Sequence, residues 1–411
     1  MISLCDVRAF IVRDGAVHLC QYKILCKMPS IAIGTNIDGP NREPFKINDF
    51  LGNGAFGEVY RAVGESSGTV VAVKLLPVGI LESADSKIAL LNEIRVAQRV
   101  KHPNVVQVLY VEDGTTSPAG PYVFMEYVSG GTLAKLIHIQ RQAGILIPLN
   151  RSIEMMIDIA QGARAINETI IHRDIKPDNI LIEGQQLKIG DFGISKFVDE
   201  GTRLHTFKGG QHLAYMAPEG WQNQANTFKL DVYSVGLLFY QILTLEHPLA
   251  SKVKDPNNFL DWEKVHLYQP CPDVRTLRRE TPLSIAQLLS RMVSKRPTDR
   301  PEWDEVLRIV SQPDNALSTE EHPSVRAAVE AVVARRRQQE KEQLAAKQRQ
   351  DEQARQLELY QYSCSALLKQ LSPIIDQFNQ HSQHGHITSA EELGFTFFRV
   401  PLGHTNPSSF F

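Results

Sequence analysis

Three glycines set between two strand-like stretches constrain the fold of this chain more than any other feature. Residues 52–59 read GNGAFGEV, and after them β-branched alternation resumes and runs on to Lys74. A dinucleotide-binding fold would begin a helix directly after the last glycine, so this context argues against one. Because glycine has no Cβ, its backbone N–H group can approach anionic oxygens closely. The pattern predicts a hairpin that covers phosphates with Gly52, Gly54 and Gly57, and a plain structural turn is the alternative.

Lys74 ends an apolar strand, and a helical pattern follows it. The apolar stripe of this helix has the spacing i, i+3, i+4, i+7 and places Glu93 on the buried face, beside Leu90, Ile94 and Ala97. A buried carboxylate is costly unless it is paired. We therefore expect Glu93 to pair with Lys74 and the lysine ammonium to face the phosphates of a nucleotide. A solvated lysine and a glutamate on an exposed helix face are the alternative.

A dense polar run, HRDIKPDN at residues 172–179, lies between two apolar segments. Asp174 can accept or orient the proton of an attacking hydroxyl, and Lys176 can neutralise a moving phosphoryl group. Asn179 can hold a metal ion, and Asp191 follows twelve residues later in the sequence GDFG. Amide and carboxylate oxygens suit Mg²⁺, so we predict Asn179 and Asp191 as its ligands. The polar run by itself is also compatible with a surface loop.

These motifs stand in one fixed order. The sequence Ala217-Pro218-Glu219 completes it and closes a segment of 29 residues, counted from Asp191 to Glu219. From about residue 45 to about residue 313 the chain resembles the eukaryotic-type protein kinase family. Lys176, two residues after Asp174, is similar to the serine/threonine type. The resemblance implies an α+β, bilobal fold, with a small β-sheet lobe that carries one helix, a larger helical lobe, and ATP with Mg²⁺ in the cleft.

The same resemblance implies roles for single residues. Catalytic roles fall to Asp174, Lys176, Lys74 and Glu93. Besides the three glycines and Lys74, the resemblance implies a base pocket, a gatekeeper and a hinge at residues 126–128, formed by Val59, Ala72, Leu181, Met125, Glu126 and Val128. Apolar residues with this spacing are equally typical of a plain core.

Two further acidic residues are predicted to have structural roles. Glu219 would be a buried carboxylate that needs a cation, and Arg300 in the sequence RPTDRP matches the late arginine of the family. Asp231 in the sequence DVYSVG fits the helix that anchors the catalytic loop.

The chain departs from the family pattern at His212, which stands where serine/threonine kinases usually have a threonine. An imidazole can donate one hydrogen bond there, but its reach differs and its charge titrates. Arg173, directly before Asp174, resembles the arginine of kinases that are switched on by phosphorylation of the activation segment. Thr202 and Thr206 are available acceptors for that phosphate.

The favoured function is that of a Mg-ATP-dependent protein serine/threonine kinase that phosphorylates its own activation segment. The alternative is a pseudokinase or scaffold, which binds nucleotide weakly and recruits partners through its C-terminal helix. The presence of Lys74, Glu93, Asp174, Asn179 and Asp191 favours the enzyme, and His212 favours the alternative.

Composition favours a cytoplasmic protein. The 411 residues carry a formal net charge of −2, which gives no sign of affinity for nucleic acid. The five cysteines are scattered without paired metal-ligand spacing, as expected of reduced thiols. No stretch approaches the length of apolar sequence that spans a membrane, and charged residues near the start argue against an export signal.

The regions on either side of the kinase-like part carry less information. In residues 1–44, alternation around Asp14 and Gly15 predicts a β-hairpin. Residues 45–313 form the predicted kinase domain, residues 314–360 a charged, helical linker, and residues 361–411 a tail of unknown role. Within residues 325–360 the apolar positions do not sustain a heptad repeat, so that part is only a candidate for self-association or for binding a partner.

Overall fold

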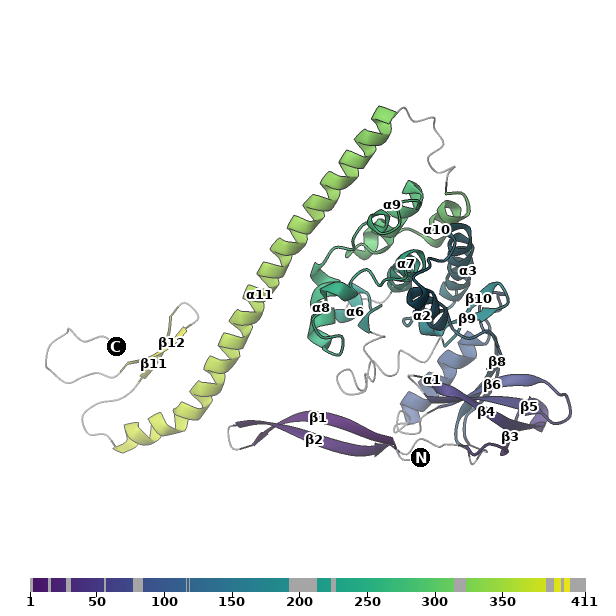
Figure 1. Ribbon diagram of the computed structural model, residues 1–411. Coiled ribbons are helices and arrows are strands. Elements are labelled where there is room, and N and C mark those ends of the chain that lie inside the picture. The colour runs from purple at the N-terminus through teal and green to yellow at the C-terminus, as the bar shows by residue number, and fades with distance from the viewer. Residues whose placement is uncertain are drawn as a thin grey trace. The chain divides into compact units, whose positions relative to one another are not determined.

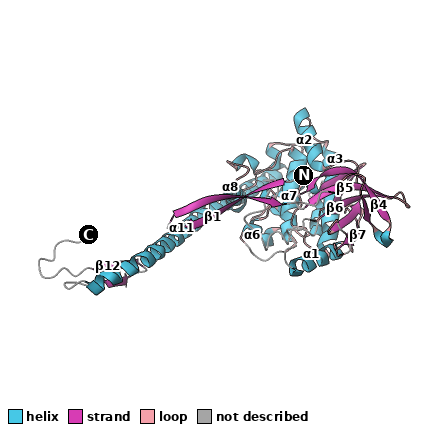
Figure 2. Ribbon diagram, turned by 90° about the horizontal axis from the view of Figure 1, so that it is seen from below, coloured by secondary structure: helices cyan, strands magenta, loops and turns pink. Residues whose placement is uncertain are grey.

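The computed structural model describes residues 3–13, 16–26, 31–54, 57–76, 84–115, 117, 119–191, 213–222, 227–313, 323–381, 388–392 and 395–399. The chain forms two compact units, Met1–Arg336 and Arg337–Phe411. The first unit contains a sheet lobe and a helical lobe (Figure 1). Figure 2 shows the strands of the sheet lobe gathered to one side of the helices. This is the predicted α+β, bilobal architecture.

The smaller lobe is built on a six-stranded antiparallel sheet with the order β3-β4-β5-β6-β8-β7. Strand β6, which reads VVAVKL, is buried at all but its first residue, as a β-branched run in the middle of a sheet should be. Helix α1 (Ala84–Ala97) belongs to this lobe. The strands are β3 (Asn36–Asp38), β4 (Pro44–Gly54), β5 (Gly57–Gly64), β6 (Val70–Leu75), β7 (Val108–Glu112) and β8 (Tyr122–Glu126).

The larger lobe surrounds helix α7 (Lys229–Thr244), which buries every residue except Lys229 and Gln241. A helix that is buried all round belongs in a core, and the sequence of α7 is apolar enough for that place. The other elements are α2 (Leu133–Ala143), α3 (Leu149–Asn167), β9 (Ile180–Glu183), β10 (Gln186–Ile189), α6 (Pro218–Trp221), α8 (Phe259–Tyr268), α9 (Leu283–Met292) and α10 (Trp303–Ser311), with short 3₁₀ helices η1 (Pro40–Arg42) in the smaller lobe and η3 (Pro177–Asn179), η4 (Ala250–Lys252), η5 (Val274–Thr276) and η6 (Pro297–Asp299) in the larger one.

Local signals in the sequence set the ends of helix α2, which follows the hinge. The hydroxyl of Thr132 accepts a hydrogen bond from the backbone N–H of Lys135, so Thr132 caps the first turn. Gly144 ends the helix in the left-handed conformation, with φ of 66°, which glycine adopts without a steric penalty.

A buried ion pair closes the larger lobe. The guanidinium of Arg300 donates to both carboxylate oxygens of Glu219, at 2.5 and 2.8 Å, and both side chains are buried. Arg300 also donates to the backbone carbonyls of Ser294 and Lys229. The predicted pairing of Glu219 with Arg300 is confirmed.

The remaining elements lie at the two ends of the chain. Strands β1 (Ser3–Arg13) and β2 (Ala16–Cys26) pair antiparallel on either side of Asp14 and Gly15, which lie outside the described residues. Helix α11 (Pro323–His381) is continuous over 59 residues, and β11 (Thr388–Glu392) pairs with β12 (Phe395–Arg399). Because β3 pairs with β4, the sheet includes residues before 45; the division of the chain into four segments stays a prediction.

Among the helices of the described ranges, none combines the length and the apolar character needed to cross a lipid bilayer.

Replacing Arg300 with Met should lower the free energy of unfolding of the kinase-like unit by about 3–5 kcal/mol, because Glu219 would remain buried without a cation. Urea unfolding followed by tryptophan fluorescence measures the change. The matched control is Arg291→Met, which removes a two-pronged pair with Glu305 at the surface. That change should cost about 0–1 kcal/mol, and equal losses in the two variants would contradict the assigned role of the buried pair.

Candidate active site

One face of the small sheet carries the residues predicted to bind a nucleotide. The strand register sets Val59 opposite Lys74 and Ala72 opposite Met125. Successive residues of a strand point to opposite faces, so Val59, Ala72, Lys74 and Met125 share one face. The other face holds the compact apolar cluster of the lobe, which includes Phe45, Ile47, Tyr60, Val71, Val73, Leu75, Tyr122 and Phe124.

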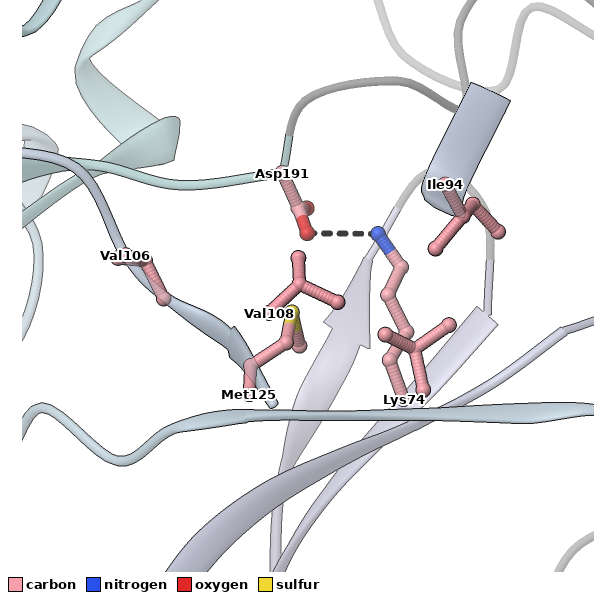
Figure 3. A pocket seen from close by; sticks show the side chains of 7 residues that line it. Lys74, Ile94, Val106, Val108, Met125 and Asp191 are labelled. Carbon is pink, nitrogen blue, oxygen red and sulfur yellow. Dashed lines mark hydrogen bonds and ion pairs between the residues drawn. The ribbon is translucent and has the colours of Figure 1, made fainter. Parts of the chain in front are cut away.

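Lys74 reaches from the sheet to the larger lobe. Its Nζ donates to Oδ1 of Asp191 at 2.7 Å, and the lysine side chain is fully buried. The two residues line one pocket with Ile94, Val106, Val108, Val123 and Met125 (Figure 3). The structure therefore brings together the predicted lysine, the predicted gatekeeper Met125 and one predicted metal ligand.

Glu93 has a different partner from the one that the sequence predicts. Glu93 lies 3.6 Å from Nη1 of Arg173, and each of these side chains is 15% exposed. Lys74 makes its ion pair with Asp191. The expected ion pair between Lys74 and Glu93 is thus replaced by two pairs that each join the two lobes. Helix spacing fixes which face of α1 carries Glu93, but not which cation that face meets.

The catalytic loop holds Asp174 between two predicted partners. Lys176 Nζ donates to both carboxylate oxygens of Asp174, at 2.9 and 3.0 Å. Asn179 Nδ2 donates to the Asp174 carboxylate at 2.9 Å and to its backbone carbonyl at 2.7 Å. All three residues are buried. The position of the carboxylate is therefore determined by hydrogen bonds from residues two and five positions further along the chain.

A buried aspartate anchors this loop to the core of the larger lobe. One carboxylate oxygen of Asp231 accepts from the backbone N–H of His172 at 2.8 Å and from Asn167 at 2.6 Å, and the other accepts from the N–H of Arg173 at 2.8 Å. The anchoring role predicted for Asp231 is confirmed. Asn167 was not predicted; it is the last residue of α3, directly before the turn that leads to the catalytic loop.

His172 connects the catalytic loop to Asp191. Its Nδ1 accepts from the backbone N–H of Asp174 at 3.2 Å, so the neutral ring donates through Nε2 to the carbonyl of Gly190 at 3.0 Å. Gly190 N–H donates to the carbonyl of Asn179 at 2.8 Å. These bonds place the two predicted metal ligands, Asn179 and Asp191, on adjoining backbone segments.

The donor atoms at this point fit a magnesium ion. Asn179 uses both hydrogens of Nδ2 toward Asp174, which leaves its side-chain carbonyl oxygen as an acceptor. Asp191 contributes a carboxylate, with its backbone held at a φ of 62°. Mg²⁺ prefers one or two such oxygen ligands from protein and takes the others from phosphates and water.

The hinge residue Glu126 is fixed by a network on its own side chain. Its carboxylate accepts from Lys188 and from the backbone N–H of Gln107. Burial acts to lower the pKa of Lys188, but the hydrogen bonds that its ammonium donates to Glu126 and Glu183 outweigh burial and raise that pKa. The Glu126 side chain is thus directed to Lys188, and the predicted role of Glu126 toward a nucleotide stays a prediction. Lys188 is a positioning residue that the sequence did not reveal.

Some of the other predicted residues belong to the described strands, and others lie outside the described part. Strands β4 and β5 close at Gly54 and Gly57, and Gly57 has a φ of 140°, which few other residues adopt. Leu181 lies on β9 and makes a bridge to Thr132, just after the hinge that contains Val128. Three residues that the sequence singled out, Thr202, Thr206 and His212, lie outside the described residues.

His247 supports the backbone directly after the segment that contains these three residues. Leu249 N–H donates to its Nδ1 at 3.3 Å, so the neutral ring donates through Nε2 to the carbonyl of Ala214 at 2.8 Å. The ring packs edge-on against Tyr215 and Trp262. Burial lowers the pKa of His247 to about 4.

Comparison with known proteins agrees with this geometry. The protein kinase domain matches residues 45–310. The chain is 28% identical over 271 residues to the probable serine/threonine-protein kinase nek2 of Dictyostelium discoideum. This alignment covers 64% of this chain and 62% of that protein. It is 31% identical over 275 residues to the human serine/threonine-protein kinase ULK1, which covers 64% of this chain and 24% of that protein. The chain thus spans less than two thirds of the length of either relative.

A solved structure shows the same fold. The kinase domain of Mycobacterium tuberculosis PknI aligns with a TM-score of 0.52 and 19% identity, and covers 69% of this chain and 98% of that domain.

Acid should destabilise the protein partly through His247. The folded protein keeps this ring neutral down to a pKa of about 4, whereas the unfolded chain binds the proton near pH 6.5. The stabilisation is complete above pH 6.5 and is lost as the pH falls from 6.5 to 4, by about 3 kcal/mol in total. The variant His247→Asn should unfold with a smaller dependence on pH in this window, as measured by urea unfolding at a series of pH values. The same slope in wild type and variant would refute this assignment.

Proposed function

This chain belongs to the protein kinase family, and we propose that it transfers the γ-phosphoryl group of ATP to serine and threonine hydroxyls of protein substrates. The observation that carries the proposal is the cluster in which Lys74, Asp191, Asp174 and Asn179 meet between the lobes. These residue types supply the positive charge, the metal ligands and the proton acceptor that phosphoryl transfer requires.

Each residue has one task in this proposal. The carboxylate of Asp174 orients the attacking hydroxyl and accepts its proton, while Lys176 lies close enough to neutralise charge on the transferred group. Lys74 binds the phosphates of the nucleotide. Asn179 and Asp191 would hold Mg²⁺, which when bound neutralises the charge on the phosphate oxygens. The face with Val59, Ala72 and Met125 would take the base, with Leu181 opposite.

We also propose that a phosphate on the activation segment exchanges the partners of Arg173. Arg173 pairs with Glu93, and its buried Nε has no hydrogen-bond partner among the described residues. A phosphate carries three acceptor oxygens and about −1.5 to −2 charges, so it competes with Glu93 for the guanidinium and also offers an acceptor to Nε. Once Glu93 is released from Arg173, its carboxylate can pair with Lys74. The Lys74–Glu93 pair is the one expected for an active kinase.

The partners in this proposal are ATP, Mg²⁺ and protein substrates, and no nucleic acid. A cytoplasmic location and an interaction through residues 325–360 remain predictions from the sequence. The rival function, a pseudokinase or scaffold that acts through its C-terminal helix, would need the same fold without the phosphoryl transfer, so an activity measurement separates the two.

Replacing Asp191 with Ala should lower phosphoryl transfer to a generic protein substrate by on the order of 10³-fold or more, because a metal ligand is lost. Lys74→Met should have a similar effect and leave the fold intact. Incorporation of labelled phosphate from ATP with Mg²⁺ measures both. The control Asp304→Ala removes an exposed carboxylate that pairs with Arg164 at the surface and should leave the rate unchanged. Wild-type activity in Asp191→Ala would rule out this mechanism.

Active protein should carry phosphate on Thr202 or Thr206, detectable by mass spectrometry. The double variant Thr202→Ala/Thr206→Ala should be less active by about tenfold or more, the loss expected for a charge-assisted hydrogen bond. If the phosphate acts through Arg173, the same double change should have little further effect in an Arg173→Met background. Unmodified threonines together with a fully active double variant would remove this hypothesis, and leave the proposed catalysis untouched.

A further inference from the structure

Helix α11 exposes large apolar side chains from Leu357 onward, and most of them recur in a regular pattern. Leu357, Tyr360, Leu367 and Ile374 are each more than half exposed, and Leu371 is partly exposed. Leu359 and Tyr362 are also exposed but lie outside this pattern. Isolated apolar residues at a surface are ordinary, but a contiguous apolar face on a long helix usually marks an interaction site.

The spacing of these residues is that of a heptad repeat. With Leu357 at position a, Leu371 also falls at a, and Tyr360, Leu367 and Ile374 fall at d. In the sequence, Cys364 and Phe378 stand at the remaining a positions, so the register runs without interruption over residues 357–378. A repeat of seven residues keeps one seam facing a partner helix only when both helices supercoil around each other. Three heptads are about the minimum that indicates a coiled coil.

The positions on either side of this seam are uncharged. The g positions are Gln356, Ser363, Gln370 and Gln377, and the e positions are Gln361, Leu368 and Ile375. The charged residues of the stretch, Glu358, Lys369 and Asp376, fall at b and f, on the side away from the seam. Charges at e and g help to set the choice of partner, and like charges that face each other there repel an identical helix. Their absence here allows two identical helices to pair.

Pro373 falls at position c, outside the seam. Proline removes one backbone donor and leaves one carbonyl of the helix without its usual partner, and its ring crowds that carbonyl, which bends a helix locally. On the outer side of the helix, water can satisfy that carbonyl, so the proline is compatible with a paired seam. Toward the N-terminus the a and d positions become Gln343, Ala346, Gln350 and Gln353. Three of these four are polar, which limits the apolar seam to the stretch from Leu357 onward.

We propose that residues 357–378 of α11 form a coiled coil with the same segment of a second copy of this chain. The occupant of the seam is a second copy because the seam is regular and apolar, long enough for a coiled coil, and carries no flanking charge that would oppose self-pairing. This segment begins at the end of the 325–360 region in which the sequence suggested self-association.

Two leucines of α11 offer a matched test. Leu367 and Leu359 are 57% and 60% exposed, but Leu367 lies at d in the seam and Leu359 at c, about 130° around the helix from its centre. The full-length chain and the variants Leu367→Lys and Leu359→Lys are compared by size-exclusion chromatography with light scattering over a dilution series. Circular dichroism of each variant checks that helix content is unchanged.

The expected result is a mass of two chains for wild type and Leu359→Lys, and a mass of one chain for Leu367→Lys at concentrations where wild type is paired. A wild-type mass of one chain at every concentration would overturn the proposal, and would point instead to a different protein or to the chain's own kinase unit as the occupant. A dimer that neither lysine dissociates, or that both dissociate equally, would also overturn it.

Discussion

The hydrogen bonds to the carboxylate of Asp231 are the interaction on which the rest of the site depends. A buried carboxylate without partners would be strongly unfavourable, and here three N–H groups, two from the catalytic loop and one from Asn167, satisfy it. The loop can therefore keep Arg173 at a φ of 66°, a conformation that non-glycine residues rarely adopt. His172 then reaches Gly190, and Gly190 precedes Asp191. A helix in the core of the larger lobe thus determines where the residue that meets Lys74 lies.

Local spacing in the sequence indicates contacts between near residues better than it indicates partners that are far apart. Motif order singled out Lys74, Asp174, Asn179 and Asp191, which the structure brings together. Val59, Ala72 and Met125 were expected only from the family resemblance, and the strand register places them on one face. Residues close in sequence, such as Asp174 and Lys176, have few ways to meet, so local spacing settles their contact. Glu93 and its partner lie on different lobes, and their contact depends on how α1 packs, which periodicity does not encode. Lys188 was missed for the same reason, because its partner Glu126 is 62 residues away.

Because Glu93 is paired with Arg173, the charges of Lys74, Asp191 and Glu93 depend on one another. Lys74 is fully buried and must have a negative partner, and in this structure Asp191 supplies it. If Asp191 binds a cation, its carboxylate is shared between that cation and Lys74. A second carboxylate would then help to stabilise the buried ammonium of Lys74. Glu93 lies on α1, whose Ile94 lines the same pocket as Lys74 and Asp191, and in this structure Glu93 is paired with Arg173. Under the exchange proposed above, an anion that binds Arg173 more strongly than Glu93 does would therefore change the environment of Lys74, although it would touch neither Lys74 nor Asp191.

The heptad repeat in α11 is not visible when only residues 325–360 are considered. Over residues 325–360 the glutamine-rich a and d positions obscure any repeat, whereas the repeat that begins at Leu357 continues to Phe378. Pairing along this seam would tether two kinase units on helices of the same length, and tethering raises the effective concentration of one unit toward another. Encounters between the activation segment of one copy and the Asp174 of its partner would then no longer depend on the concentration of the protein. The coiled coil and the exchange of partners at Arg173 are separate interactions. The coiled coil would bring two kinase units together, and Arg173 would then bind the phosphate that one unit adds to the activation segment of the other.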